Sequence, residues 1–82
     1  MSQRVKVEMP KVSYEMETGV VQSWLFRVGD RVEKDMPVVD IETEKATVDV
    51  MAPVSGTLVE IVHDSGAEVP AGTTIGWIDA DE

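Results

Sequence analysis

The second half of the chain repeats the first, and this repeat constrains the fold more than any other feature of the sequence. A shift of 37 residues superposes glycines and large apolar residues of the two halves. A shift of 43 residues superposes their opening segments, and the difference is the extra length of the loop before Gly19. Two such halves, each of about four strands, can close face to face around a shared core. The matched pairs are Gly19 with Gly56, Gly29 with Gly66, Val32 with Val69, Ile41 with Ile78, Val5 with Val48, Val7 with Val50 and Pro10 with Pro53.

Each half has the pattern of short strands rather than helices. Gly or Pro recurs every few residues, and the apolar runs between them are rich in Val and Ile. Evenly spaced runs of this kind predict an all-β sandwich or barrel, with strands near 4–9, 20–26, around Val32, 38–42 and 47–51. Val21 and Trp24 are three residues apart, as are their repeat partners, which predicts a β-bulge in both halves. Gly29 and Gly66 stand in turns and are expected to adopt positive φ.

The stretch ETEKA, residues 42–46, joins two strand-like runs and predicts a hairpin. Its tip contains no Gly or Asn, so a type I turn centred on Glu44 and Lys45 is expected. The Lys45 amine then stands in water, and the tip is expected to pack against nothing. A two-fold relation between the halves places Lys45 opposite Glu82, with both chain ends at the far end of the molecule.

Composition restricts the class of protein. A chain of 82 residues forms one small domain. Sixteen acidic against seven basic residues give a net charge of −9, which argues against nucleic acid and anionic membranes as partners. No run approaches the ~18 apolar residues of a membrane span. The absence of cysteine excludes disulfides and thiolate chemistry and fits a reducing compartment.

Intrinsic catalysis is not supported by the sequence. His63 is a lone histidine, and neither a metal-ligand cluster nor a base partner for a serine nucleophile is visible. Lys45 is expected to be exposed, with Glu42 and Glu44 nearby, whereas a Schiff-base lysine needs a desolvated site. Lys45 is therefore better suited to accept an acyl group that another enzyme has activated.

Residues 29–58, GDRVEKDMPVVDIETEKATVDVMAPVSGTL, closely resemble the lipoyl domains of 2-oxo acid dehydrogenase complexes. Those domains carry an E-T-D/E-K-A hairpin, a preceding G-D-x-V turn and a following P-x-x-G segment. MPKVSYEMETG, residues 9–19, is similar to their M-P-x-L-S-x-T-M-x-x-G loop. The resemblance spans roughly residues 5–78. It implies a flattened barrel or sandwich of two four-stranded antiparallel sheets with quasi-two-fold symmetry and the lysine on an exposed hairpin.

The resemblance also implies a function. Lys45 matches the lysine that is joined by an amide to lipoic acid. The domain would be a non-catalytic carrier whose swinging arm is reductively acylated by a thiamine-diphosphate 2-oxo acid decarboxylase. The acyl group would pass to the acyltransferase core, and dihydrolipoamide dehydrogenase would reoxidise the arm. Residues 1–82 would then be a single lipoyl domain, an N-terminal piece of a larger dihydrolipoamide acyltransferase, monomeric when isolated.

Partner-contacting residues are implied in the same way. Glu42 and Gly56 match positions linked to recognition by the lipoylating enzyme, a lipoate ligase or a lipoyl/octanoyl transferase. The loop before the second strand is an expected contact for the decarboxylase, although Val12 and Glu15 depart from the family pattern. The recognition residues on the hairpin and nearby are Glu42, Thr43, Glu44, Ala46 and Gly56, and the loop residues are Val12, Ser13, Tyr14, Glu15, Met16, Glu17 and Thr18.

Three alternatives remain open. A biotinyl carrier domain resembles the lipoyl domain in fold, but its lysine sits in M-K-M, whereas Lys45 lies between Glu44 and Ala46. The glycine-cleavage carrier also holds lipoyl-lysine, but it is longer and has helical segments. An unmodified β-barrel that only docks a partner is the third.

The bacterial cytoplasm is expected as the location of this protein in preference to the mitochondrial matrix.

Overall fold

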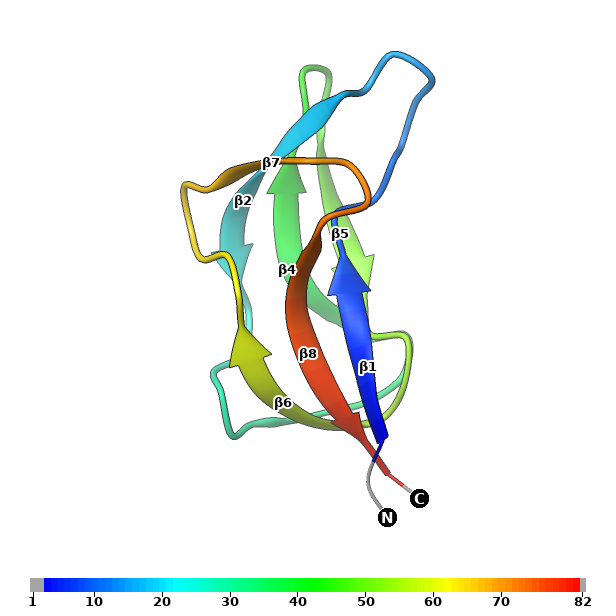
Figure 1. Ribbon diagram of the computed structural model, residues 1–82, viewed down its shortest axis with the longest axis vertical. Coiled ribbons are helices and arrows are strands. Elements are labelled where there is room, and N and C mark those ends of the chain that lie inside the picture. The colour runs from blue at the N-terminus through cyan, green and yellow to red at the C-terminus, as the bar shows by residue number, and fades with distance from the viewer. Residues whose placement is uncertain (1–2, 82) are drawn as a thin grey trace.

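A computed structural model describes residues 3–81, which form eight strands and no helix (Figure 1). The prediction of an all-β fold is therefore confirmed, and the strands expected near 4–9, 20–26, 38–42 and 47–51 agree to within two residues. No helix of residues 3–81 has the length and apolarity to cross a membrane. The strands are β1 (Gln3–Glu8), β2 (Thr18–Trp24), β3 (Arg31–Val32), β4 (Pro37–Glu42), β5 (Thr47–Met51), β6 (Gly56–Ile61), β7 (Glu68–Pro70) and β8 (Thr74–Ala80).

The strands of residues 3–81 form two four-stranded antiparallel sheets, with the orders β1-β8-β6-β3 and β5-β4-β2-β7. Both sheets are open, so the arrangement is a sandwich rather than a closed barrel. The repeat maps β1, β2, β3 and β4 onto β5, β6, β7 and β8, and this mapping converts one sheet order into the other. The quasi-two-fold symmetry is confirmed. The expectation that the two halves face each other is wrong, because each sheet takes two strands from each half.

The core lies between the two sheets and is built from repeat-related residues. Val21 and Leu58 are fully buried, and so are Ile41 and Ile78. Each of these pairs places one residue on each sheet, so the two inner faces contribute equally. Alternation along the strands turns such side chains inward and leaves polar neighbours outside.

Both halves contain the predicted irregularity. The β2–β4 register shifts between Val21 and Ser23, and the β6–β8 register shifts between Leu58 and Glu60. These two β-bulges are 37 residues apart in the sequence. Each bulge turns the strand so that residues three apart, such as Val21 and Trp24, both pack on the core.

Positive φ angles recur at equivalent turns. Gly29 has φ of 100° and Gly66 has φ of 92°, as predicted. The sequence analysis missed a second equivalent pair, Asp35 with φ of 71° and Gly72 with φ of 90°. Aspartate adopts this region more readily than most residues with a Cβ, which explains why it can stand where the other half has glycine.

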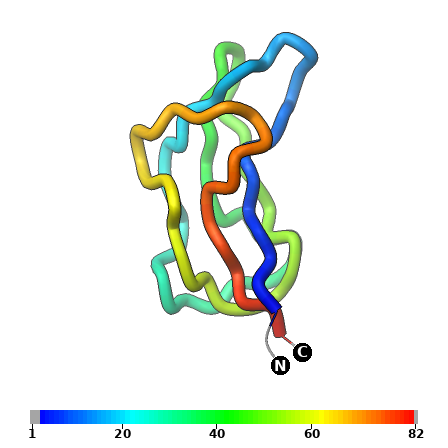
Figure 2. Tube along the Cα trace, in the orientation of Figure 1, coloured from blue at the N-terminus to red at the C-terminus, as the bar shows by residue number. Residues whose placement is uncertain are grey.

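The hairpin and the chain ends lie at opposite ends of a molecule with extents of 39 × 21 × 18 Å (Figure 2). Gln3 pairs with Ala80, so the described ends of the chain leave side by side. The β4–β5 hairpin and the loop before β2 form the other end. This confirms the predicted separation of Lys45 from the ends, although Glu82 itself lies outside the described residues.

Candidate functional site

The hairpin that carries Lys45 is closed by a threonine side chain. The Thr43 hydroxyl accepts hydrogen bonds from the amides of Ala46 at 3.2 Å and Lys45 at 3.4 Å. It also donates to the Ala46 carbonyl at 2.9 Å, and the Thr43 amide donates to the same oxygen at 2.8 Å. Within residues 3–81 the one non-glycine residue with positive φ is Asp35, so the tip avoids positive φ as predicted. The tip is therefore held through the Thr43 side chain and backbone.

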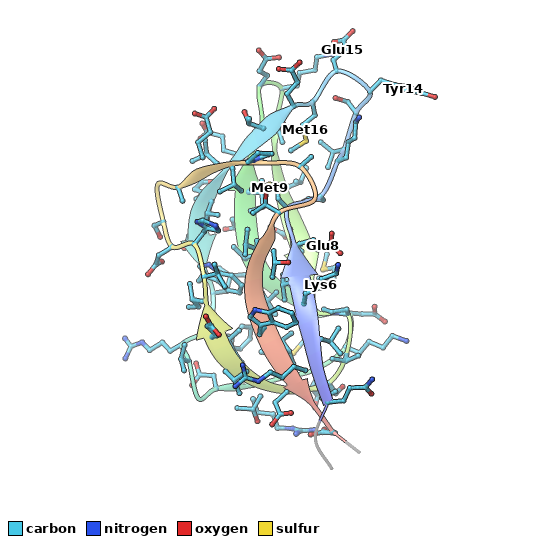
Figure 3. The ribbon with its side chains drawn as sticks, viewed as in Figure 1. Lys6, Glu8, Met9, Tyr14, Glu15 and Met16 are labelled. Carbon is cyan, nitrogen blue, oxygen red and sulfur yellow. The ribbon has the colours of Figure 1, made fainter. Side chains whose placement is uncertain are left out.

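The loop before β2 arches beside the hairpin tip and is anchored by a methionine (Figure 3). Met16 is buried in the core, and its sulfur accepts a hydrogen bond from the Val12 amide at 3.4 Å. Its side chain lies close to Gly19, where an added Cβ would stand 2.9 Å from Met16 Cε and 2.6 Å from Met9 Sδ. Tyr14, at the outer end of the loop, is 99% exposed. Met16 therefore positions the loop, and Tyr14 is available to a partner.

A hollow of about 450 Å³, here called the tip pocket, separates this loop from the hairpin. The loop and tip that the sequence analysis selected are thus brought together, with β5 and β7 completing the wall. Tyr14 is the one loop residue of that set outside the lining described for residues 3–81. The lining residues are Val12, Ser13, Glu15, Met16, Glu17, Thr18, Thr43, Glu44, Lys45, Ala46, Val48 and Glu68.

An ion pair joins the tip to the loop. Lys45 Nζ lies 3.7 Å from Glu15 Oε2, and the two side chains are 74% and 79% exposed. Such exposed pairs contribute roughly 0–1 kcal/mol because water screens them. The expectation that the tip packs against nothing is therefore wrong, since Lys45 has a partner on the loop. Glu15 departs from the family pattern, so a sequence comparison alone gave no sign of this contact.

Gly56 is not part of this site. It is the first residue of β6 and pairs with Val32 and with Ala80, at the end of the sandwich where the chain ends lie. A Cβ at Gly56 would collide with the carbonyl oxygen of Asp79. The close approach of β6 to β8 therefore requires glycine here. Of the predicted recognition residues, the other four lie on the hairpin and Gly56 lies apart.

The hairpin also carries a carboxylate pair that the sequence analysis missed. Asp40 on β4 stands directly opposite Asp49 on β5. A hydrogen bond between the two carboxyl groups, and secondarily desolvation and repulsion, raise the pKa of Asp40 above its ordinary value. The register of the hairpin could have revealed this pair, because pairing Glu42 with Thr47 fixes Asp40 opposite Asp49.

Lys45 suits covalent attachment of an acyl group. Its amine is exposed at the end of a short hairpin, where a modifying enzyme can reach it. The described residues lining the tip pocket include neither histidine nor cysteine, and no cluster within residues 3–81 fits a metal ion. The pocket wall combines the apolar Val12, Met16 and Val48 with a rim of glutamates. The arrangement can hold an amide-linked group without taking part in its chemistry.

Curated relatives carry this domain as part of much longer chains. The acetyltransferase component of the acetoin cleaving system of Bacillus subtilis, a dihydrolipoyllysine-residue acetyltransferase, is 46% identical over 95% of this chain and 20% of its own length. The corresponding component of the pyruvate dehydrogenase complex of Corynebacterium glutamicum is 39% identical over 88% of this chain and 11% of its own. The chain thus spans a fifth or less of these relatives.

Solved structures share the fold. The lipoyl domain of the 2-oxoglutarate dehydrogenase complex from Azotobacter vinelandii has a TM-score of 0.69 and 30% identity, covering 88% of this chain and 94% of that one. Urea carboxylase from Kluyveromyces lactis has a TM-score of 0.77 and 29% identity, covering 93% of this chain and 6% of that one. The family model Biotin_lipoyl, described as "Biotin-requiring enzyme", matches residues 5–78. The resemblance to lipoyl domains is thereby confirmed, and the chain belongs to the Biotin_lipoyl family.

Proposed function

We propose that this domain carries lipoic acid, joined by an amide to Nζ of Lys45. The observation that supports the proposal most directly is the placement of Lys45. Its amine is exposed on a hairpin closed by Thr43, at the end of the molecule opposite the chain ends. A domain tethered at one end and modified at the other can present its arm to several partners.

The residues of the hairpin hold the attachment point in place. Thr43 restrains the turn through three hydrogen bonds, so Lys45 starts from a fixed backbone position. Glu15 lies across from the unmodified amine. Formation of the amide removes the positive charge of Lys45 and leaves the Glu15 carboxylate without this partner. The loop and the tip are then joined by one contact fewer.

The cofactor would supply the chemistry, and the domain would supply mobility and concentration. Attached to Lys45, the cofactor would supply a ring disulfide that a 2-oxo acid decarboxylase could reductively acylate, that the acyltransferase core could deacylate and that dihydrolipoamide dehydrogenase could reoxidise. Tethering raises the effective concentration of the arm at each partner to the millimolar range. The relatives' names support placing residues 1–82 as one lipoyl domain within a longer acyltransferase component.

The exposed hairpin residues are proposed as the surface that a lipoate ligase or a lipoyl/octanoyl transferase reads. Glu42, Glu44 and Ala46 are exposed around Lys45. On the other side of the tip pocket, Tyr14 is proposed as the contact of the loop with the decarboxylase, since a fully exposed aromatic side chain provides a large binding area.

Biotin is the second candidate, because the family model that matches residues 5–78 is described as "Biotin-requiring enzyme". The residues beside Lys45 argue for lipoate, since biotinyl domains carry M-K-M and this chain has Glu44 and Ala46. The names of the acyltransferase relatives support the same choice.

Intact mass after incubation with lipoate ligase, biotin ligase, ATP and both cofactors would decide between the two. We expect the mass of the wild-type protein to increase by that of one lipoyl group. This increase should be absent in Lys45→Arg and present in Lys34→Arg, a matched substitution at another exposed lysine. A biotin adduct would establish the second candidate. A mass without adduct, despite lipoylation of a known lipoyl domain in the same tube, would refute both.

A further inference from the structure

We propose that the tip pocket is a resting site for the free end of the lipoyl arm attached to Lys45, so that the arm alternates between a docked and an extended state. The inference rests on the proposed function and adds to it a binding site on the carrier itself. The ligand class is a neutral, largely apolar ring or short acyl chain delivered from the amide at Lys45.

The size and the walls of the tip pocket suit such a group. Its volume of about 450 Å³ lies within the range of small-molecule sites, roughly 300–1,000 Å³. Val12, Met16 and Val48 provide apolar surface on facing sides, from the loop and from β5. Methionine is flexible and polarisable, so the Met16 side chain can adapt to a sulfur-containing ring.

Because the arm is attached at the rim of the tip pocket, even a weak intrinsic affinity is sufficient for the arm to occupy the pocket. Lys45 and Ala46 themselves line the tip pocket, so an arm on Lys45 begins at its edge. A short flexible tether gives an effective concentration in the millimolar range. A docking equilibrium with an intrinsic dissociation constant of about 1 mM would therefore fill the pocket for about half of the time. The arm would remain available to partners without a separate release step.

The charges of the tip pocket favour a neutral arm over anionic ligands. Among the described residues of the lining, Lys45 is the one cation, and Glu15, Glu17, Glu44 and Glu68 are acids. Amide formation removes the cation, and the remaining four carboxylates repel anionic molecules such as phosphate esters. A neutral ring meets no such repulsion. Breaking the pair between Lys45 and Glu15 also removes the side-chain link between tip and loop.

Methyl-resolved NMR of the wild-type domain tests the docked state directly. The spectra of valine and methionine methyl groups are compared for unmodified protein, protein with Nε-acetyl-lysine at position 45, and lipoylated protein. Acetylation removes the charge without supplying an arm. We expect the methyl signals of Val12, Met16 and Val48 to move further on lipoylation than on acetylation, with nuclear Overhauser contacts to the arm only on lipoylation, while Val28 stays unchanged.

A chemical measurement tests the same contact independently. After reduction of the arm, its thiols are alkylated with the neutral reagent N-ethylmaleimide. Val12→Asn should raise the alkylation rate by up to about twofold, because part of the apolar wall is lost and the docked arm was protected for about half of the time. Val28→Asn is the matched control, because Val28 is 56% exposed against 47% for Val12 and lies outside the lining of the tip pocket. It should react at the wild-type rate.

Two results would overturn the inference. One is that lipoylated and acetylated protein give the same methyl spectra without arm contacts. The other is that Val12→Asn and Val28→Asn are alkylated at equal rates. Intact mass separates these outcomes from failure of the proposed function: a protein that carries lipoate but shows no docking refutes only the resting site, whereas a protein that cannot be lipoylated refutes both.

Discussion

At the scale of single residues, Lys45 combines exposure with one weak contact. Its ion pair with Glu15 is highly exposed, so losing it costs at most about 1 kcal/mol. Lys45→Ala should therefore abolish cofactor attachment, measured by intact mass, while lowering the unfolding midpoint by only a few degrees. Thermal unfolding monitored by circular dichroism would measure this change in the midpoint. A large drop in the midpoint would mean that the lysine supports the fold.

Gly56 and Gly19 are repeat partners with different surroundings. A Cβ at Gly56 meets the backbone of Asp79, which cannot move aside, whereas a Cβ at Gly19 meets the flexible ends of Met9 and Met16. We expect Gly56→Ala to destabilise the fold by more than ~2 kcal/mol and Gly19→Ala to cost less, as measured by urea unfolding.

The same pair of variants separates a structural from a recognition role of Gly56. Because Gly56 lies away from the hairpin, the folded fraction of Gly56→Ala should still accept lipoate at Lys45. If this variant folds as stably as wild type and yet is not lipoylated, the modifying enzyme contacts Gly56 directly.

At the scale of elements, the hairpin specifies where the amine points. Exchanging Glu44 and Lys45 moves the amine by one position along the turn, and a one-residue shift changes the face to which a side chain turns. Charge and composition stay constant in this double variant. We expect lipoylation, measured by intact mass, to fall at least about tenfold. Lipoylation to the same extent as in wild type would show that the modifying enzyme does not recognise the position of the lysine on the tip.

The Asp40–Asp49 pair makes the stability of the hairpin strands depend on pH. The pKa of Asp40 is raised in the folded state, so the folded protein holds this proton more tightly than the unfolded chain does. The stabilisation is therefore complete below the unfolded pKa and is lost as pH rises to the folded pKa. Asp81 acts in the opposite sense, because its hydrogen bond with Arg31 lowers its pKa and stabilises the fold at higher pH.

Asp40→Asn should remove the loss of folding stability that follows deprotonation of the Asp40–Asp49 pair. We expect its unfolding midpoint to exceed that of wild type at pH 7, and the difference to shrink toward pH 3. Glu17→Gln, which removes one exposed negative charge elsewhere, controls for the change in net charge. An equal gain in both variants would assign the effect to net charge alone.

At the scale of the whole molecule, the site lies where the internal symmetry is broken. The repeat equivalent of β4 is β8, which leads into no hairpin within residues 3–81, and the equivalent of the loop before β2 is a much shorter turn. The segment from Glu8 to Thr18 is longer than that from Met51 to Gly56. This extra length forms one wall of the tip pocket. The symmetric strands build a rigid support, and the two asymmetric segments carry the function.

Local patterns allowed much of this structure to be predicted from the sequence. Alternation and turn residues gave the strands, the slip at Val21 and Trp24 gave the bulges, and Gly29 and Gly66 gave the positive φ angles. The absence of Gly and Asn near Lys45 predicted that the tip avoids positive φ. Each of these features depends on residues close together in the chain, where backbone sterics and strand periodicity act directly.

The sequence by itself determined the repeat, the all-β class and the exposed lysine, whereas the tertiary structure decided which distant segments meet. Strand exchange between the halves, the contact of Glu15 with Lys45 and the tip pocket all depend on pairing across long separations. Such pairing is selected by the joint burial of the inner faces of both sheets, and the sequence of one segment alone does not determine it. For the same reason Gly56, grouped with the hairpin by resemblance, was placed by the fold at the opposite end, against the backbone of Asp79.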